Sequence, residues 1–169
     1  LIPDEPVSAE RAIEDLADIF RGSMRKADSL ISLSEELDLA WKYLQIELRR
    51  LGGRLSVEWQ VDDLPKGAMI LPLTLQPLLE NAVAHGIQPR VEGGELRIYG
   101  RGEKDNVVIT ISNPAGPDGH VSEGHGMALD NIRERLVLAF GPSASLITHQ
   151  NDEQFFAVLS LPYVESTDN

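Results

Sequence analysis

The sequence contains no cysteine among its 169 residues. This absence excludes disulfide bonds, thiolate metal sites and cysteine nucleophiles, and it is typical of a protein that works in a reducing compartment. No apolar run approaches the roughly 20 residues that a membrane-spanning helix needs. Positive charge is also scarce, because 15 Lys and Arg face 27 Asp and Glu, giving a formal net charge of −12. This balance argues against nucleic acid or an anionic membrane as the main ligand.

The composition is that of one globular domain. Apolar residues make up 42% of the chain, and a chain of this length is expected to build a single hydrophobic core. Internal repeats and low-complexity segments are absent from the sequence. Because the first residue is Leu1 rather than methionine, we expect the chain to be a piece of a longer protein.

The most informative stretch runs from Leu71 to Gly94. Its apolar residues recur at helical spacing and predict one buried stripe, formed by Leu75, Leu78, Leu79, Ala82 and Val83. Asn81 and His85 lie four residues apart, beside Glu80, on a second and polar stripe facing away from the core. A glycine-rich loop that permits close approach of a ligand follows. On this segment alone, an ordinary amphipathic helix with a polar outer face is an equal alternative.

A second stretch, from Ile109 to Leu136, combines a strand, a loop and a helix. The alternating strand runs into Asn113, and a loop rich in Gly, Pro and Asp leads to Gly124 and Gly126. The predicted core face of the helix that follows comprises Leu129, Ile132, Leu136 and Ala139. Glycines at a helix N-terminus let backbone N–H groups and the helix dipole meet an anion, most often phosphate.

Together these stretches resemble the ATP-binding domain of the GHKL superfamily, and more narrowly the sensor histidine kinases of the LytS/AlgZ type. The first motif of that group, roughly LxLQPLxENAxxHG, is matched by Leu73, Leu75, Gln76, Pro77, Leu78, Glu80, Asn81, Ala82, His85 and Gly86. The second, GxGLxNxRERL, is matched by Gly124, Gly126, Asn131, Arg133, Glu134, Arg135 and Leu136. The resemblance covers nearly the whole chain. It implies the Bergerat fold, an α/β two-layer sandwich in which helices cover one face of a mixed, mostly antiparallel sheet.

The resemblance also implies a division of the chain. Residues 1–30 would be the remnant of a dimerisation and phosphoacceptor hairpin, residues 31–165 the catalytic domain, and residues 166–169 a tail. A helix predicted from Ser8 has an apolar stripe formed by Ala12, Ile13, Leu16, Ile19 and Phe20, and it would be the second helix of that hairpin. The alternative is an ordinary N-terminal helix packed on the domain.

The remaining elements follow from periodicity and capping signals. Ser32 and Glu35 have the spacing of a capping box and predict a helix that extends to Leu51. Its predicted core stripe comprises Leu37, Ala40, Trp41, Leu44, Leu48 and Leu51. Alternating or apolar runs predict strands at residues 55–61, 95–101, 106–112, 145–148 and 155–161.

By resemblance, Asn81 is the metal ligand of the site, and its side-chain oxygen would bind the Mg²⁺ that bridges the ATP phosphates. The alternative is an interior amide bonded to the backbone. Glu80, the other predicted catalytic residue, would orient Asn81, contact a metal-bound water or act as a base, and we favour the first two roles. His85 would lie near the phosphates or the lid, although a capping or stacking histidine is nearly as good an interpretation.

Asn113 would accept a hydrogen bond from the adenine amino group, where many GHKL domains have an aspartate. Loss of the charge-assisted bond would cost about 1–2 kcal/mol. Ala84 likewise replaces a lysine of many relatives. The other residues predicted to contact nucleotide are Gly86, Gly116, Gly124, His125, Gly126 and Met127, and residues 116–123 would form the ATP lid. Arg133 and Arg135 would touch nucleotide or a partner helix, but a solvated face is the favoured interpretation.

The resemblance therefore implies the cytoplasmic, ATP-binding catalytic domain of an inner-membrane sensor kinase that acts as a homodimer. Mg-ATP would donate its γ-phosphoryl to a histidine upstream of Leu1, for relay to a response regulator of the LytTR type, with no direct contact to nucleic acid. A degenerate domain used for docking or dimerisation is the alternative. An ATPase of the gyrase kind is weaker, because Pro77 occupies the position of its catalytic glutamate.

Overall fold

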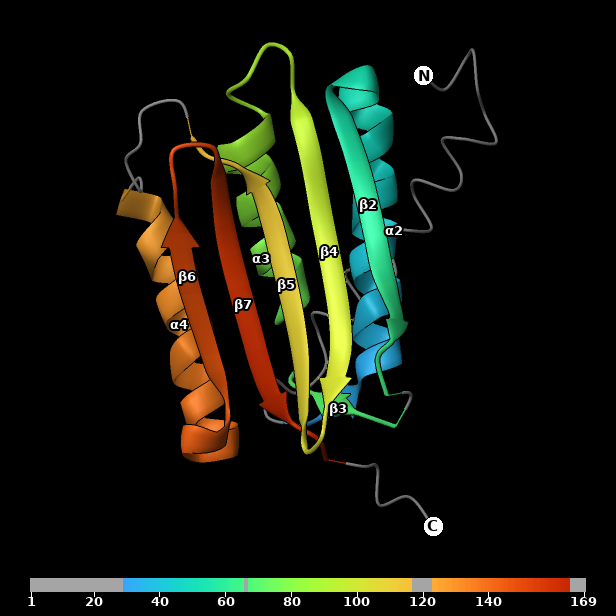
Figure 1. Cartoon of the computed structure of the whole chain (residues 1–169), viewed down its shortest axis with the longest axis vertical. Coiled ribbons are helices and arrows are strands. Elements are labelled where there is room, and N and C mark those ends of the chain that lie inside the picture. The colour runs from blue at the N-terminus through green and yellow to red at the C-terminus, as the bar shows by residue number, and fades with distance from the viewer. Residues whose placement is uncertain (1–28, 66, 117–122, 165–169) are drawn as a thin grey trace.

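The structure, a computed structural model, describes residues 29–65, 67–116 and 123–164, and for 123–125 it describes the backbone alone (Figure 1). In chain order the elements are β1 (Ile31–Ser32), α2 (Leu33–Leu51), β2 (Leu55–Asp63), β3 (Met69–Ile70), α3 (Leu75–Ala82), a π-helical turn (Val83–Ile87), β4 (Gly94–Glu103), β5 (Asn106–Pro114), α4 (Glu123–Phe140), β6 (Ser145–Gln150) and β7 (Gln154–Pro162). Short 3-10 turns follow α2 and α4. The helix predicted from Ser8, most of the lid and the tail lie outside the described residues.

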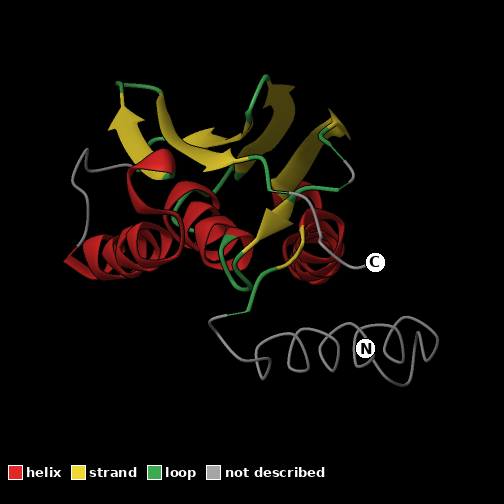
Figure 2. Ribbon diagram, turned by 90° about the horizontal axis from the view of Figure 1, so that it is seen from below, coloured by secondary structure: helices red, strands yellow, loops and turns green. Residues whose placement is uncertain are grey.

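Five strands form one mixed sheet in the order β2-β4-β5-β7-β6. The β2–β4 pair is parallel and the other three pairs are antiparallel. Helices α2, α3 and α4 lie side by side on one face of this sheet (Figures 1 and 2). The predicted two-layer α/β architecture is therefore confirmed. None of the described helices is long and apolar enough to span a membrane.

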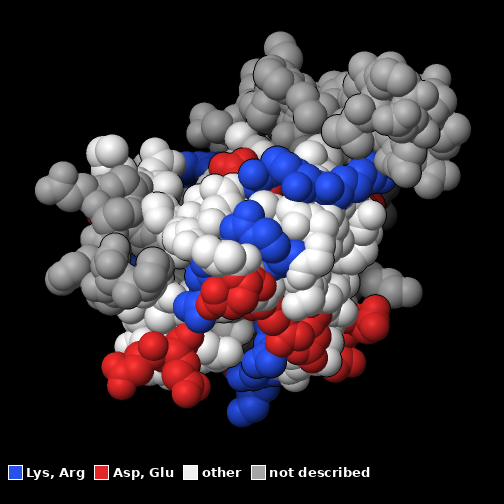
Figure 3. All heavy atoms as spheres, turned by 90° about the horizontal axis from the view of Figure 1, so that it is seen from above, with Lys and Arg blue, Asp and Glu red and all other residues white. Residues whose placement is uncertain are grey.

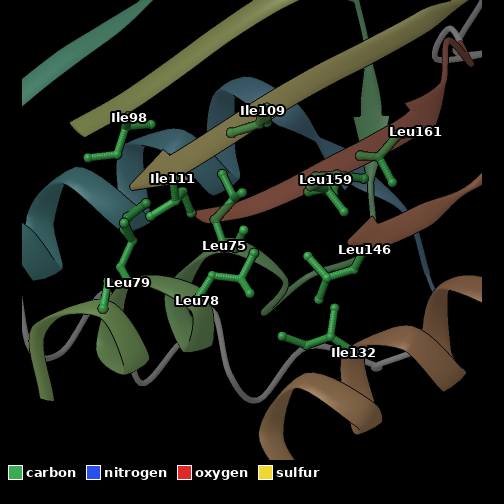
Figure 4. Close-up of a cluster of buried hydrophobic side chains, with 14 of the residues drawn as sticks. Leu75, Leu78, Leu79, Ile98, Ile109, Ile111, Ile132, Leu146, Leu159 and Leu161 are labelled. Atoms are coloured by element: carbon green, nitrogen blue, oxygen red, sulfur yellow. The ribbon is translucent and has the colours of Figure 1, made fainter. Parts of the chain in front are cut away.

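The core lies between the sheet and the helices. Strand register places Ile98 opposite Ile111 and Ile109 opposite Leu159, so apolar side chains line the inner face of the sheet. Figure 4 shows leucines of α3 packed against this row. All five residues of the predicted α3 stripe are buried, as expected from their spacing. The chain stays helical as a π-helical turn from Val83 to Ile87, however, and so passes beyond Gly86, where the glycine-rich loop was predicted to begin.

Helix α2 begins as its capping signal predicts, but its buried face differs from the prediction. The Ser32 hydroxyl accepts a hydrogen bond from the Glu35 amide at 3.1 Å. Trp41, predicted to be in the core, is 37% exposed and packs against Trp59 with ring centroids 5.2 Å apart. Glu36 and Glu47 are buried instead. The buried stripe is thus rotated by about one position, because α2 contacts α3 as well as the sheet.

A substitution at Ser32 tests whether its hydroxyl caps α2. Ser32→Ala is expected to lower the free energy of unfolding by about 1 kcal/mol, since it leaves the Glu35 amide without its acceptor. Urea denaturation would measure the loss. Ser34→Ala, at an exposed position of the same helix, is the matched control and should change stability by only a few tenths of a kcal/mol, roughly. Equal losses would show that the Ser32 hydroxyl does not cap the helix.

Helix α4 buries Leu129, Ile132 and Leu136 as predicted. Ala139, the last residue of the predicted stripe, is exposed, so that prediction was wrong. Val137 and Leu138 in the same turn are exposed as well, and only Phe140, the last residue of the helix, packs against the core.

Candidate functional site

The residues predicted to bind nucleotide come from segments that meet at one end of the sheet. The C-terminal end of α3, the end of β5 and the start of α4 all lie at the upper end in Figure 1. This follows from topology, since α3 and β5 run toward that end while α4 starts there. The fold therefore gathers the two motifs, which are far apart in the sequence.

Asn113 at the end of β5 lies against Gly86 in the turn after α3. Asn113 is 3% exposed, and its Nδ2 donates to the Pro114 carbonyl oxygen at 2.8 Å. Its Oδ1 is buried and has no hydrogen-bond partner among the described residues. A Cβ atom on Gly86 would lie 2.2 Å from Asn113 Nδ2, so only glycine lets the asparagine lie against the helical turn. A buried acceptor without a donor fits a ligand that carries an amino group.

The segment that follows Asn113 passes over the end of α3. A Cβ on Gly116 would lie 3.7 Å from the His85 carbonyl oxygen. Arg90, in the loop before β4, donates from Nη1 to the Ala115 carbonyl oxygen at 3.2 Å and forms an ion pair with Glu92 at 3.1 Å. Sequence reasoning missed Arg90, because no periodicity or motif spacing marks a loop residue. It ties this loop to the base of the lid.

Asn81 is 8% exposed, which corrects its predicted place on a polar outer stripe. Glu80 is exposed and accepts a hydrogen bond from Gln76 Nε2 at 2.9 Å, so neighbouring residues of α3 project to different surroundings. Within the described residues, no three acidic or histidine side chains cluster to hold a metal ion.

The start of α4 brings two glycines of the second motif to this end of the sheet. Gly124 and Gly126 lie in its first turn, where amide N–H groups have no acceptor within the helix. Met127 is 74% exposed. The His125 side chain and residues 117–122 lie outside the description, so their predicted contacts with nucleotide stay predictions.

Positive charge gathers at this end of an otherwise acidic chain. Figure 3 shows a band of Lys and Arg side chains across it. Helix α2 ends with Arg49 and Arg50, and Arg54 donates from Nη2 to the carbonyl oxygens of Gln88 and Arg90, both at 2.8 Å. Arg50 is paired with Glu47 and Arg90 with Glu92, so neighbouring carboxylates neutralise part of this positive charge.

Arg133 and Arg135 do not form the solvated face that was predicted. Both are half-buried. Arg133 Nε donates to the Leu146 carbonyl oxygen at 3.0 Å, and Arg135 Nη1 donates to the Leu73 carbonyl oxygen at 3.0 Å. These motif arginines join α4 to β6 and to the chain before α3, respectively.

Glu36 is a further buried polar group that sequence reasoning missed. It is 2% exposed, and its carboxylate accepts hydrogen bonds from the amides of Leu73, Thr74 and Leu75 at the start of α3. Burial raises the pKa of this carboxyl above its usual value, while the three N–H donors and the charge of Arg135 act against that rise. Neither α2 nor α3 carries a local signal for this contact.

Comparisons with known proteins point to one family. A family model described as histidine kinase matches residues 1–55. The sensor histidine kinase YesM of Bacillus subtilis is 34% identical over 148 residues, covering 85% of this chain and 26% of that protein. The sensor protein LytS of Staphylococcus saprophyticus is 29% identical over 176 residues, covering 96% of this chain and 30% of that protein.

Solved structures share the fold. The catalytic domain of the histidine kinase ThkA superimposes with a TM-score of 0.61 at 14% sequence identity, covering 80% of this chain and 97% of that one. ThkA has also been solved in complex with the response regulator protein TrrA. The chain spans less than a third of the length of the two relatives it matches. These matches and the shared fold show that the chain belongs to the LytS-like sensor histidine kinases, as a catalytic domain with the GHKL fold.

Proposed function

We propose that this chain binds Mg-ATP and supplies the phosphoryl donor site of a sensor histidine kinase. The observation that carries the proposal is the buried Oδ1 of Asn113, which lacks a partner among the described residues, in a side chain that lies against Gly86. An adenine amino group would provide the missing donor. Asparagine in place of aspartate keeps the acceptor and removes only its charge.

The other residues would act by position. The Asn81 oxygen would bind Mg²⁺, and the first-turn amides at Gly124 and Gly126 would face the phosphates. Glu80 would act through a metal-bound water, and His85 would lie near the phosphates or the lid. When bound, Mg²⁺ would neutralise charge on the phosphates, and phosphoryl transfer depends mainly on such neutralisation and on orientation.

The role of the whole protein follows from its relatives. The γ-phosphoryl group would pass to a histidine outside this chain and then to an aspartate of a response regulator, for which a LytTR-type regulator is our proposal. Residues 1–30 would be the remnant of the phosphoacceptor hairpin through which the full protein dimerises. The domain would lie on the cytoplasmic side of a membrane-anchored sensor. The alternative of a non-catalytic docking module finds no support in the names of the relatives described above.

Calorimetric titration with ATP, with and without Mg²⁺, tests the proposal. We expect micromolar to submillimolar binding that Mg²⁺ tightens. Asn81→Ala should lower the affinity for Mg-ATP by about tenfold or more, since losing even a group that only supports a metal ligand typically weakens metal binding tenfold, while thermal unfolding shows an intact fold. Binding of ATP without Mg²⁺ should change little.

Asn106→Ala is the matched control, because Asn106 is an exposed asparagine at the opposite end of β5. It should leave the Mg²⁺ effect unchanged. Unaltered Mg-ATP affinity in Asn81→Ala would refute the metal assignment. No binding of wild-type protein at millimolar nucleotide would refute the proposed function and favour a docking module.

A further inference from the structure

Leu73, which lies two residues before α3, adopts an unusual backbone conformation. Its φ is +56°, in the left-handed region that L-residues with a side chain rarely occupy. A non-glycine residue persists in such a conformation only when its surroundings hold it there, and positions of this kind concentrate at functional sites. The strained position immediately precedes the helix that carries Asn81 and leads into Gly86.

Two charged side chains from different helices hold this position. The Glu36 carboxylate of α2 accepts a hydrogen bond from the Leu73 amide at 3.2 Å. Arg135 of α4 donates hydrogen bonds to the Leu73 carbonyl oxygen at 3.0 Å and to the Pro72 carbonyl oxygen at 2.5 Å. Both peptide groups that flank the strained φ and ψ angles are thereby fixed. We call Glu36, Leu73 and Arg135 the α3 clamp.

Glu36 also replaces the usual cap of α3. The N-cap residue Thr74 makes no side-chain cap bond, because its hydroxyl donates to the Leu71 carbonyl oxygen at 2.8 Å. Instead, Glu36 Oε1 accepts hydrogen bonds from the backbone amides of Thr74 and Leu75, at 2.8 and 2.9 Å. A carboxylate at a helix N-terminus satisfies orphan N–H groups and meets the positive end of the dipole. The start of α3 is therefore anchored by α2 rather than by its own sequence.

We infer that Glu36 and Arg135 are positioning residues of the nucleotide site. This inference rests on the proposed function. The clamp fixes the start of α3, and because a helix transmits its position along its length, it also sets the place of Asn81. Arg135 belongs to the same helix whose first turn holds Gly124 and Gly126. The clamp thus couples the proposed metal ligand on α3 to the proposed phosphate-binding turn on α4.

The inference makes a selective prediction for Arg135→Gln. Displacement of α3 relative to α4 should disturb the Mg²⁺–phosphate part of the site, so that the tightening of ATP binding by Mg²⁺ falls by roughly tenfold. Binding of adenosine, which lacks phosphates, should change less than twofold. Titrations run well below the unfolding temperature separate this effect from a loss of folded protein. Arg135→Lys, which keeps the charge beside Glu36 but has no planar fork, should restore part of the Mg²⁺ effect.

Arg133→Gln is the matched control. Arg133 belongs to the same motif and also bonds a backbone carbonyl, but its partners are Leu146 and Thr148 on β6 and Asp130 on α4 itself, and none of them lies on α3 or in the segment before it. It should lower stability and leave the Mg²⁺ effect intact. The inference would be overturned if Mg²⁺ tightened ATP binding equally in both variants, or if Arg135→Gln kept the wild-type tightening.

Amide hydrogen exchange supplies a readout that does not need nucleotide. Arg135→Gln should speed exchange across residues 75–82 of α3, and Arg133→Gln should not. If wild-type protein failed to bind Mg-ATP, the proposed function would fall, and exchange alone would decide whether the clamp holds α3. Unchanged exchange in α3 would show that Arg135 does not hold that helix, and the inference would fail.

Discussion

Gly86→Ala is expected to abolish measurable binding of adenine nucleotides while the domain stays folded. The added Cβ would lie 2.2 Å from Asn113 Nδ2, 2.8 Å from its Cγ and 2.9 Å from its Cβ. Real Cβ atoms do not approach neighbours this closely, so the Asn113 side chain must leave its place. Its Oδ1, the buried acceptor proposed to bind the adenine amino group, then moves with it. A site built to hydrogen-bond a ligand loses affinity steeply when one partner is misplaced.

The helix itself should tolerate this change. Gly86 has a negative φ within the turn that extends α3, and alanine is the better helix former by about 1 kcal/mol. Loss of binding would therefore report the displaced asparagine rather than a broken helix. Calorimetric titration with ATP measures the loss, and circular dichroism checks the fold.

Two further variants make the test specific. Gly53→Ala adds a methyl group where nothing lies within 4 Å, and it should bind nucleotide like the wild type. Gly86→Ala combined with Asn113→Ala removes the two closest overlaps, with Nδ2 and Cγ, and leaves only the 2.9 Å approach of the two Cβ atoms, so stability should recover in part relative to Gly86→Ala alone while binding stays weak. Wild-type affinity in Gly86→Ala would show that Asn113 does not contact the base.

Local sequence signals predicted the parts of this domain that depend on neighbours along the chain. The spacing of Leu75, Leu78 and Leu79 predicted the buried face of α3, and the Ser32–Glu35 spacing predicted the start of α2, because helical periodicity and capping act within a few residues. The register of the β4–β5 hairpin likewise depends on a short turn.

Burial of Asn81 could not be predicted in this way. A periodic pattern assumes one buried face and one solvated face, but α3 lies between α2 and α4 and also packs on the sheet (Figure 1). Contacts on several sides bury residues that the pattern assigns to solvent. The same limit explains Glu36 and Arg135, which find their partners 37 to 63 positions away in the sequence. The sequence motif suggested that Arg135 faces solvent or a ligand, whereas in the fold its side chain donates hydrogen bonds to backbone carbonyl oxygens.

Gly93→Ala is expected to be the most destabilising of the glycine substitutions considered for this domain. Gly93 has a φ of +73°, where a side chain costs about 1–2 kcal/mol. In addition, its Cβ would lie 1.7 Å from the Arg54 carbonyl oxygen, an overlap with backbone that no rotamer change can relieve. Together these effects should lower the free energy of unfolding by about 4 kcal/mol or more, a value reached only by severe changes.

Gly141→Ala separates the two contributions. Gly141 has a similar φ of +60°, but nothing lies within 4 Å of its Cβ position, so only the conformational cost of about 1–2 kcal/mol applies. Urea denaturation of both variants gives the cost of the close approach by difference. Equal losses would show that the loop before β4 moves away from Arg54 without penalty.

Gly93→Ala should also weaken nucleotide binding, even in molecules that remain folded. Gly93 ends the loop that Arg54 holds through the carbonyl oxygens of Gln88 and Arg90. Arg90 in turn holds the Ala115 carbonyl oxygen at the base of the lid. Displacing the loop therefore withdraws a support from the segment that follows Asn113. We expect a lower ATP affinity for Gly93→Ala at temperatures where it is folded and an unchanged affinity for Gly141→Ala, whose glycine lies at the other end of α4 from the site.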